Sequence, residues 1–280
     1  VVRAGYGAST IPFPDNRYAF SFPVKQNYAG SLANNFSRAG SMAAGFPAPV
    51  LVSIPSDGVI AAAGSLLNST YDAIPPDLHE GILHSWNIAF QRQLPFGFSA
   101  DIAYVGTKGA NLVMDVDRNA SLVYGSGNAG RPQFAAFNRT GTTRTRTNLG
   151  KSQYHAMQVK VDRRFRNGFL ITNSYTLARS KDLANENGGV GTPIDFDLSW
   201  GRSDTDRLHN YVLSAVYELP WGPGKKWMNE GMVSKIAGGW QVSALYEAQS
   251  GVSLTITGNG TLLNTNGNTA FANLTGEIGR

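Results

Sequence analysis

Few residues of this 280-residue chain could carry out catalysis, and their spacing does not form a complete catalytic motif. The segment from Gly125 to Gly130 fits the G-x-G-x-x-G pattern of a dinucleotide-binding turn, but such a site needs a following helix and an acidic residue about 20 positions later. Pro132 follows almost at once, and no acidic residue lies between Arg144 and Gly150. We therefore expect residues 125–130 to form a flexible external loop.

Metal ligands and nucleophiles are also scarce. The chain contains no Cys, so it has no thiolate metal site, disulfide or Cys nucleophile. His79 and His84 are five residues apart, which is the wrong spacing for one helical face, so we expect His84 to lie on a surface at an interface. Paired acids such as Asp195 and Asp197, or Asp204 and Asp206, are expected to solvate a loop or bind an adventitious cation rather than to act as glycosidase acids. We predict that the protein is not an enzyme and has no cofactor or metal.

The composition indicates a protein that faces an apolar environment. Charged residues make up 15% of the chain, against about a quarter in ordinary globular proteins. Aromatic residues make up 11%, and the net charge is only +5. This balance excludes a charge-rich disordered tail and a coiled coil. Because no run of about 18 consecutive apolar residues is present, a transmembrane helix is not expected, whereas a transmembrane barrel remains possible.

Alternation of apolar and polar residues recurs along the chain, and this period of two predicts an all-β protein. The clearest example begins at Leu83. Every second residue there is mainly aromatic or aliphatic, and the residues between them mainly carry amides; we call these two alternating sets the two parities of a strand. The predicted strands are 83–94, 98–105, 153–165, 169–177, 210–219 and 239–249, with weaker strands at 2–8, 18–24 and 252–257. The turns Pro95-Phe96-Gly97 and Arg166-Asn167-Gly168 predict tight hairpins.

Long and short connections alternate along this pattern. We expect long loops at 107–151 and 178–209, a long segment before residue 83, and a medium connection at 220–238. The long loops then fall at one end of the strands, as in transmembrane barrels with short periplasmic turns and long outside loops. Strands of about 9–11 residues also match the crossing of an apolar band.

The two parities predict which side chains face lipid and which face a hydrated lumen. The predicted lumen-facing residues are Asn87, Gln91, Asp101, Lys160, Glu218, Gln241 and Glu247. The predicted lipid-facing residues are Trp86, Phe90, Tyr104, Tyr217, Trp240 and Tyr246. Trp221 and Trp227 lie near turns, as an aromatic girdle requires. Periodicity alone does not say which face is inside, because a soluble barrel would have the opposite polarity.

Several segments carry a family resemblance, in this order along the chain: Ser85–Pro95 (SWNIAFQRQLP), Ala103–Gly109 (AYVGTKG), Arg163–Phe169 (RRFRNGF), Ser174–Ser180 (SYTLARS), Tyr217–Lys225 (YELPWGPGK) and Gly238–Ser243 (GGWQVS). Together they resemble the barrel of Oar-like TonB-dependent receptors of the bacterial outer membrane. The resemblance implies a 22-stranded antiparallel transmembrane β-barrel with an N-terminal plug. We expect residues 1–280 to be a barrel fragment of about eight or nine strands, without the plug, the carboxypeptidase-regulatory-like N-terminal domain or the closing strands.

The same resemblance implies a function in the bacterial outer membrane. Receptors of this family capture a ligand with extracellular loops and import it through the plugged barrel, with energy from the TonB complex. The implied partners are outer-membrane lipid and lipopolysaccharide, the TonB complex through a missing N-terminal region, and a small-molecule, saccharide or peptide ligand that the sequence does not name. Two alternatives stay open: a non-transporting adhesion or structural barrel, and a secreted all-β carbohydrate-binding protein.

One basic cluster is a candidate ligand-contacting site within the expected loop 107–151. Its members alternate with threonines and are Arg139, Arg144, Arg146 and Lys151. The cluster could capture an anionic ligand, contact lipopolysaccharide phosphates, or simply be solvated. Nucleic-acid binding is not expected, because the aromatic residues follow the strand parity and form no stacking platform beside the basic residues.

Overall fold

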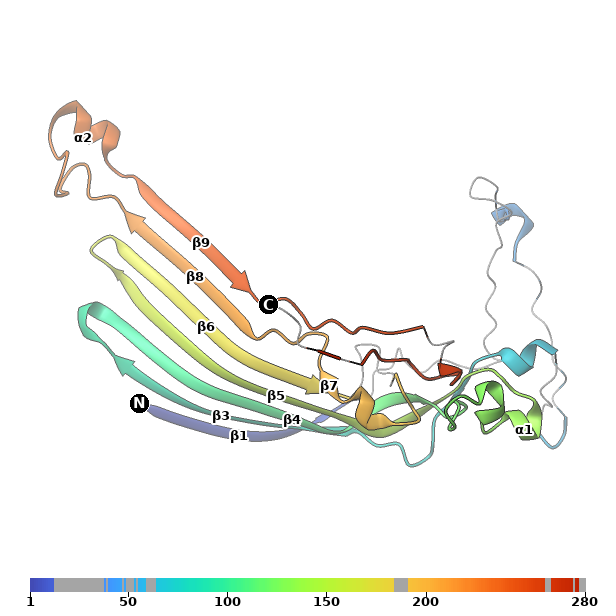
Figure 1. Cartoon of the computed structure of the whole chain (residues 1–280). Coiled ribbons are helices and arrows are strands. Elements are labelled where there is room, and N and C mark those ends of the chain that lie inside the picture. Colours follow the sequence, from blue (N-terminus) through green and yellow to red (C-terminus); the bar gives the residue numbers. More distant parts are fainter. Residues whose placement is uncertain are drawn as a thin grey trace.

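Alternating apolar and polar residues build a single curved sheet that is antiparallel except where β2 pairs with β5 in parallel (Figure 1). The computed structural model describes residues 1–12, 38, 40–46, 48, 53, 55–58, 64–183, 191–259, 263–273 and 275–276. Within this part of the chain the nine strands are β1 Val2–Ile11, β2 Tyr71–Ala73, β3 Gly81–Gln93, β4 Phe98–Asp117, β5 Thr143–Arg166, β6 Phe169–Asp182, β7 Gly201–Arg202, β8 His209–Glu218 and β9 Gln241–Gln249. Seven of them follow the order β1-β3-β4-β5-β6-β8-β9, while β2 pairs with β5 and β7 pairs with β6.

The helical segments are all short. They are α1 Phe134–Phe137, α2 Gly231–Ala237 and the 3-10 turns Met42–Ala44, Gly64–Asn68, Pro95–Gly97, Gly127–Gly130 and Phe196–Ser199. Among the described residues, no helix has the length and apolar character needed to cross a membrane.

The predicted strands are confirmed with two exceptions. The expected strand 18–24 lies outside the described residues. The expected strand 252–257 is wrong, because this segment leaves the sheet and makes only one isolated bridge, between Thr257 and Phe271. Its backbone bonds to a later segment instead: the Gly258 amide donates to the Ala270 carbonyl, and the Ala272 amide donates to the Ile256 carbonyl.

Both predicted hairpin turns are present and use left-handed backbone conformations. Phe96 and Gly97 have φ values of 62° and 80°, and Asn167 and Gly168 have φ values of 55° and 76°. Two consecutive residues with positive φ give the backbone twist that suits a tight β-hairpin. The two turns therefore fix the pairing of β3 with β4 and of β5 with β6.

The predicted long loop 107–151 is much shorter in the structure. β4 has 20 residues and β5 has 24, so the connection between them covers only residues 118–142. The alternation is lost because the register shifts between Gly109 and Leu112 and again between Leu112 and Met114. Beyond these irregularities the strands continue, since Met114 packs in a small buried cluster against Leu183.

The outer parts of β4 and β5 are too long to be contained in a membrane. Twenty residues at about 3.3 Å each span roughly 66 Å, whereas the apolar band of a transmembrane barrel is about 25 Å tall. Even with a strand tilt of about 45°, the strands are longer than such a band requires. One end of the sheet must therefore project from any apolar layer that the rest of the sheet crosses.

The tight hairpin turns lie at one end of the sheet, and the β4–β5 and β6–β8 connections lie at the other (Figure 1). The end with the β3–β4 and β5–β6 turns, which we call the turn end, also carries the chain start and the β8–β9 connection with α2. The other end, which we call the loop end, carries the connections β4–β5 and β6–β8. The predicted asymmetry holds for the hairpins, but the medium connection 220–238 lies at the turn end.

Candidate functional site

The predicted lumen-facing residues share one face of the sheet, which we call the polar face. Residues paired across neighbouring strands point to the same side, and side chains alternate along each strand. Gln91 pairs with Asp101, and Asp101 pairs with Lys160. Through the same register and parity, the other members of this face are Asn87, Glu218, Gln241 and Glu247.

The predicted lipid-facing residues share the opposite, apolar face. Phe90 pairs with Ile102, and Ile102 pairs with Val159. By register and parity this face also carries Trp86, Tyr104, Tyr217 and Tyr246. Trp240 directly precedes β9, and its carbonyl accepts a hydrogen bond from the Leu219 amide. Within the strands, all the predicted lumen-facing residues therefore lie on one side of the sheet, and all the predicted lipid-facing residues lie on the other.

A cavity of about 200 Å³ opens on the polar face near the loop end. Its lining consists of Tyr154, Thr176, Ala178, Ser180, Thr205, Asp206, Arg207 and Asn210. Asp206 is only 4% exposed and accepts hydrogen bonds from the Ser180 amide at 2.6 Å and from Arg179 Nη1 at 3.2 Å. The expectation that Asp206 solvates a loop is therefore wrong, because its carboxylate anchors the β6–β8 connection to β6.

The four basic residues of the candidate ligand-contacting cluster do not lie in one loop. Arg144, Arg146 and Lys151 belong to β5, and only Arg139 lies in the β4–β5 connection. The expectation of a loop location is wrong for these three residues, because β5 begins eight residues before Lys151, at Thr143.

Arg139 is a buried link between three backbone segments. Its Nη2 donates to the carbonyls of Ser69 at 3.0 Å and Thr142 at 2.9 Å, and its Nε donates to Gln133 Oε1 at 2.9 Å. The guanidinium also lies over the Tyr71 ring, 4.0 Å from its centroid. Burial lowers the pKa of Arg139 from its usual value. These contacts give Arg139 a structural role in holding the connection against β2.

Arg144 and Arg146 share two carboxylates with the neighbouring strands. Arg146 Nη1 lies 2.8 Å from Asp115, and Arg144 Nε lies 2.5 Å from Asp72. Each arginine also lies 3.8 Å from the other carboxylate. The hydrogen bond to Asp72 raises the pKa of Arg144. Because these charges are balanced across β2, β4 and β5, they stabilise the projecting part of the sheet.

Lys151 is the most exposed member of the cluster. Its ammonium lies 4.8 Å from the centroid of the Trp200 ring, which is within the range of a cation–π contact. Its position in β5 places it on the same side as His155, four residues further along the strand. The contact that Lys151 makes with Trp200 is therefore separate from the ion pairs that Arg144 and Arg146 make with their carboxylates.

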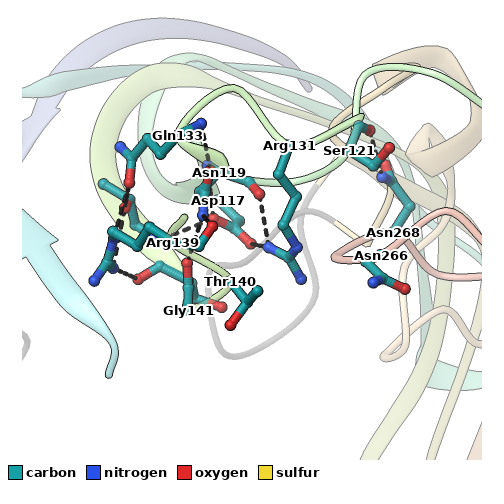
Figure 2. Close-up of polar contacts among 12 residues, drawn as sticks. Asp117, Asn119, Ser121, Arg131, Gln133, Arg139, Thr140, Gly141, Asn266 and Asn268 are labelled. Atoms are coloured by element: carbon teal, nitrogen blue, oxygen red, sulfur yellow. Dashed lines mark hydrogen bonds and ion pairs between the residues drawn. The ribbon is translucent and has the colours of Figure 1, made fainter. Parts of the chain in front are cut away.

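A buried polar network at the loop end shapes the β4–β5 connection (Figure 2). Asn119 is fully buried, and its Oδ1 accepts a hydrogen bond from the Gln133 amide at 2.9 Å. Asp117 Oδ1 accepts from the amides of Asn119 and Thr143, both at 2.9 Å. Arg131 Nη1 donates to the Asn119 carbonyl at 2.6 Å. The connection is thus built around internal polar contacts.

The sequence analysis missed the segment 263–273, which joins two loop-end connections. Its Asn266 carbonyl accepts a hydrogen bond from the Ser121 amide at 2.7 Å. Asn268 Nδ2 donates to the Ser121 carbonyl at 2.8 Å, and Asn268 Oδ1 accepts from the Ile194 amide at 2.9 Å. The only sequence signal is a series of alternating asparagines, which does not identify their partners.

The glycine-rich segment 125–130 packs against this segment and forms no nucleotide-binding turn. Gly127–Gly130 is a single 3-10 turn, and the next helix, α1, has only four residues. A Cβ at Gly127 would lie 2.9 Å from Asn264 Oδ1, and one at Gly130 would lie 2.1 Å from Ser121 Oγ. Glycine is therefore required here for close packing.

Among the described residues, no three His, Asp or Glu side chains lie close enough together to hold a metal ion. The predictions that the protein has no cofactor and is not an enzyme stay predictions.

An antiparallel sheet with one apolar and one polar face is typical of outer-membrane barrels. The model of a family described as "Outer membrane beta barrel domain" matches residues 1–279. The chain belongs to this family and is a protein of the bacterial outer membrane.

Other comparisons are less informative. The chain is similar to the crystal structure of the outer membrane transporter YddB from Escherichia coli, with 13% identity and a TM-score of 0.36. That similarity covers 54% of this chain and 20% of the transporter. No curated protein sequence matches this chain.

Proposed function

We propose that this chain forms part of the wall of a TonB-dependent outer-membrane receptor that captures a ligand with its extracellular loops and imports it. The proposal is supported by membership of the outer-membrane barrel family, together with the resemblance of segments such as Ser85–Pro95 to Oar-like receptors. The plug and the remaining barrel strands are then supplied by other parts of the same protein.

The observation that carries the proposal is the separation of the two sheet faces by register. The apolar face, with Phe90 and Ile102 exposed side by side, meets lipid. The polar face, with Gln91 opposite Asp101, lines a hydrated lumen or contacts the plug. In this orientation the turn end is periplasmic and the projecting loop end is extracellular.

The cavity around Asp206 then opens toward the lumen at the extracellular side. Arg207 and Asn210 contribute a cation and an amide to its lining. A polar solute that has passed the loops would meet these groups first. The lining offers both donors and acceptors, so it favours a hydrophilic ligand such as a saccharide or peptide.

The orientation is tested by a matched pair of substitutions in adjacent residues of β3. Phe90→Arg places a charge in lipid, which costs about 2–4 kcal/mol near the midplane of a barrel, and should strongly reduce assembly into the outer membrane. Gln91→Arg places the same charge in the lumen and should assemble normally. Equal assembly of the two variants, measured by heat-modifiable mobility of outer-membrane fractions, would refute the orientation.

Transport itself needs a separate experiment with the complete protein. Solutes removed from the medium are compared by mass spectrometry for wild-type cells, cells lacking this protein and cells lacking TonB. A TonB-dependent importer removes at least one solute only when both proteins are present. Removal that is independent of both proteins contradicts import.

An adhesion or structural barrel is the second candidate. The buried contacts of Asn119 and Arg139 favour it, because a loop end that is held by internal hydrogen bonds offers a fixed surface to a partner. In that case deletion of the gene would reduce surface attachment and leave solute uptake unchanged. The secreted carbohydrate-binding alternative does not agree with the outer-membrane family.

A further inference from the structure

The cavity beside Asp206 forms where the backbone pairing along β6 is interrupted. The Ser203 amide donates to the Ser180 carbonyl at 3.1 Å, and the Ala178 amide donates to the Leu208 carbonyl at 2.9 Å. Four residues lie between Ser203 and Leu208, but only one lies between Ala178 and Ser180 on β6. The chain therefore bulges away from β6 between these two bonds, and the Asp206 carboxylate accepts the Ser180 amide in place of a backbone carbonyl.

The other walls of the cavity come from polar-face residues of three strands. Thr176, Ala178 and Ser180 alternate along β6 and therefore point to the same side. Tyr154 of β5 pairs with Ser180, and Asn210 of β8 pairs with Thr176. Ala178 lies between the two hydroxyl residues and has only a methyl side chain, so it leaves room for a ligand above β6.

Asn210 brings a buried amide oxygen without a partner to this cavity. Its Oδ1 makes no hydrogen bond to any residue that the structure describes. An unpaired buried acceptor costs about 1–3 kcal/mol, and such groups are rare in native proteins. Because Asn210 lines the cavity, a hydroxyl or N–H group of a bound molecule can donate to this oxygen.

The charges around the cavity favour an anionic ligand. Asp206 does not oppose an anion strongly, because its carboxylate lies 3.2 Å from Arg179 Nη1. Arg207 donates from Nη1 to the Ser250 carbonyl at 3.1 Å and forms no ion pair within the described ranges. The other N–H groups of its guanidinium can therefore bind a carboxylate, whose geometry matches this planar group.

The size and the lining of the cavity favour a single sugar ring. Its volume of about 200 Å³ is smaller than the roughly 300–1,000 Å³ of sites that enclose a drug-sized ligand, so it fits one ring-sized unit of a larger molecule. Apart from Ala178, every lining residue carries a polar group. An apolar amino-acid side chain would find little to pack against here, whereas a ring that carries several hydroxyls would find hydrogen-bond partners.

We propose that this cavity binds a hexuronic acid unit of an acidic saccharide. The proposal rests on the function proposed above, in which the polar face lines the lumen. Arg207 binds the carboxylate, and Asn210 Oδ1 accepts a hydrogen bond from a ring hydroxyl. The carboxylate distinguishes this ligand from neutral sugars, and the ring hydroxyls distinguish it from the carboxyl terminus of a peptide.

The proposal is tested on the complete protein purified from outer membranes in mild detergent. The probes are D-glucuronate, D-glucose, which has a hydroxymethyl group in place of the carboxylate, and the dipeptide alanyl-alanine, which has a carboxylate but no hydroxyls. Saturation-transfer-difference NMR measures the dissociation constant of each probe. The variants are Arg207→Gln and Asn210→Leu. The matched control is Arg202→Gln, which removes an exposed cation at the same end of the sheet but outside the cavity lining.

We expect wild type and Arg202→Gln to bind glucuronate at least ten-fold more tightly than glucose or the dipeptide. Arg207→Gln should lose this preference and bind the two sugars alike. Asn210→Leu should weaken the binding of both sugars at least five-fold. It should not reduce stability to urea, because it removes a polar atom that has no partner in the protein.

Equal binding of glucuronate and glucose by wild type, or tighter binding of the dipeptide, would overturn the proposal. A loss of stability in Asn210→Leu would also overturn it, since the amide would then have a structural partner. If glucuronate gives no signal while TonB-dependent removal of another solute is observed, the cavity assignment alone is wrong. If glucuronate binds as expected but no solute is removed through TonB, the import function alone is wrong.

Discussion

The side-chain amide of Asn119 donates to the carbonyl oxygens of Arg139 at 3.2 Å and Gly141 at 2.8 Å, so a single buried residue at the end of β4 holds the strand that returns as β5. Its Oδ1 accepts from the Gln133 amide, so both N–H donors and one oxygen lone pair of the Asn119 side chain are used inside the protein. The loop end is thus stabilised by hydrogen bonds, with few buried apolar residues.

Asn119→Ala should locally unfold the β4–β5 connection. The substitution leaves three backbone groups without this partner, two of them buried, and each buried group costs about 1–3 kcal/mol. Hydrogen exchange should become faster for residues 118–142 while exchange in the β3–β4 hairpin stays slow. Arg118→Ala, at an exposed position of the same connection, is the control. Unchanged exchange in the first variant would show that Asn119 does not hold the connection.

Arg146→Met should destabilise the projecting part of β4 and β5. Arg146 is 4% exposed, and its removal takes away the cation that lies 2.8 Å from the Asp115 carboxylate, whose side chain is 16% exposed. Breaking a buried ion pair in this way costs about 3–5 kcal/mol. Unfolding in urea is the measurement, and the double variant Arg146→Met with Asp115→Leu should recover part of the loss. A single variant as stable as wild type would contradict the structural role.

Gly168→Ala should weaken the β5–β6 hairpin. Gly168 has a φ of 76°, and a Cβ there would lie 3.2 Å from Glu218 Cβ. A left-handed conformation costs a residue with a side chain about 1–2 kcal/mol, and the close contact adds to this cost. The control is Gly201→Ala, where a Cβ has open space. Stability to urea should fall only in the first variant, and equal stability would exclude turn strain.

α2 should lie at the periplasmic surface of the lipid layer. Its apolar residues Met232 and Ile236 are 79% and 72% exposed, and Trp240 Nε1 donates to the Ile236 carbonyl at 3.0 Å. A short helix with one apolar side can rest in the boundary between headgroups and acyl chains. Because the chain has no Cys, Ile236→Cys and Lys235→Cys can each carry one environment-sensitive dye. Blue-shifted emission is expected for residue 236 only, and equal spectra would contradict this placement.

The sequence predicted the membrane-crossing part of the fold because its signals are local. Alternation over about ten residues identifies each strand, and Asn167-Gly168 identifies a hairpin without knowledge of distant residues. A short turn also fixes which residues of two neighbouring strands lie opposite each other. Phe90 therefore shares a face with Ile102, and Gln91 shares the other face with Asp101.

The loop end could not be predicted because its contacts join residues far apart in the chain. The pair Arg144 and Asp72 is separated by 72 positions, and Asn268 and Ser121 by 147. The irregular register between Gly109 and Met114 also conceals the continuation of β4. As a result, arginines that looked available to a ligand are in fact joined to carboxylates within the sheet.

The most direct test of the central claim is the accessibility of single cysteines in the complete protein assembled in the outer membrane. The four variants are Phe90→Cys, Gln91→Cys, Asp101→Cys and Ile102→Cys, each treated with a membrane-impermeant maleimide. The orientation predicts labelling at 91 and 101 through the hydrated lumen and protection at 90 and 102 by lipid. Labelling at 90 and 102 with protection at 91 and 101 would contradict it.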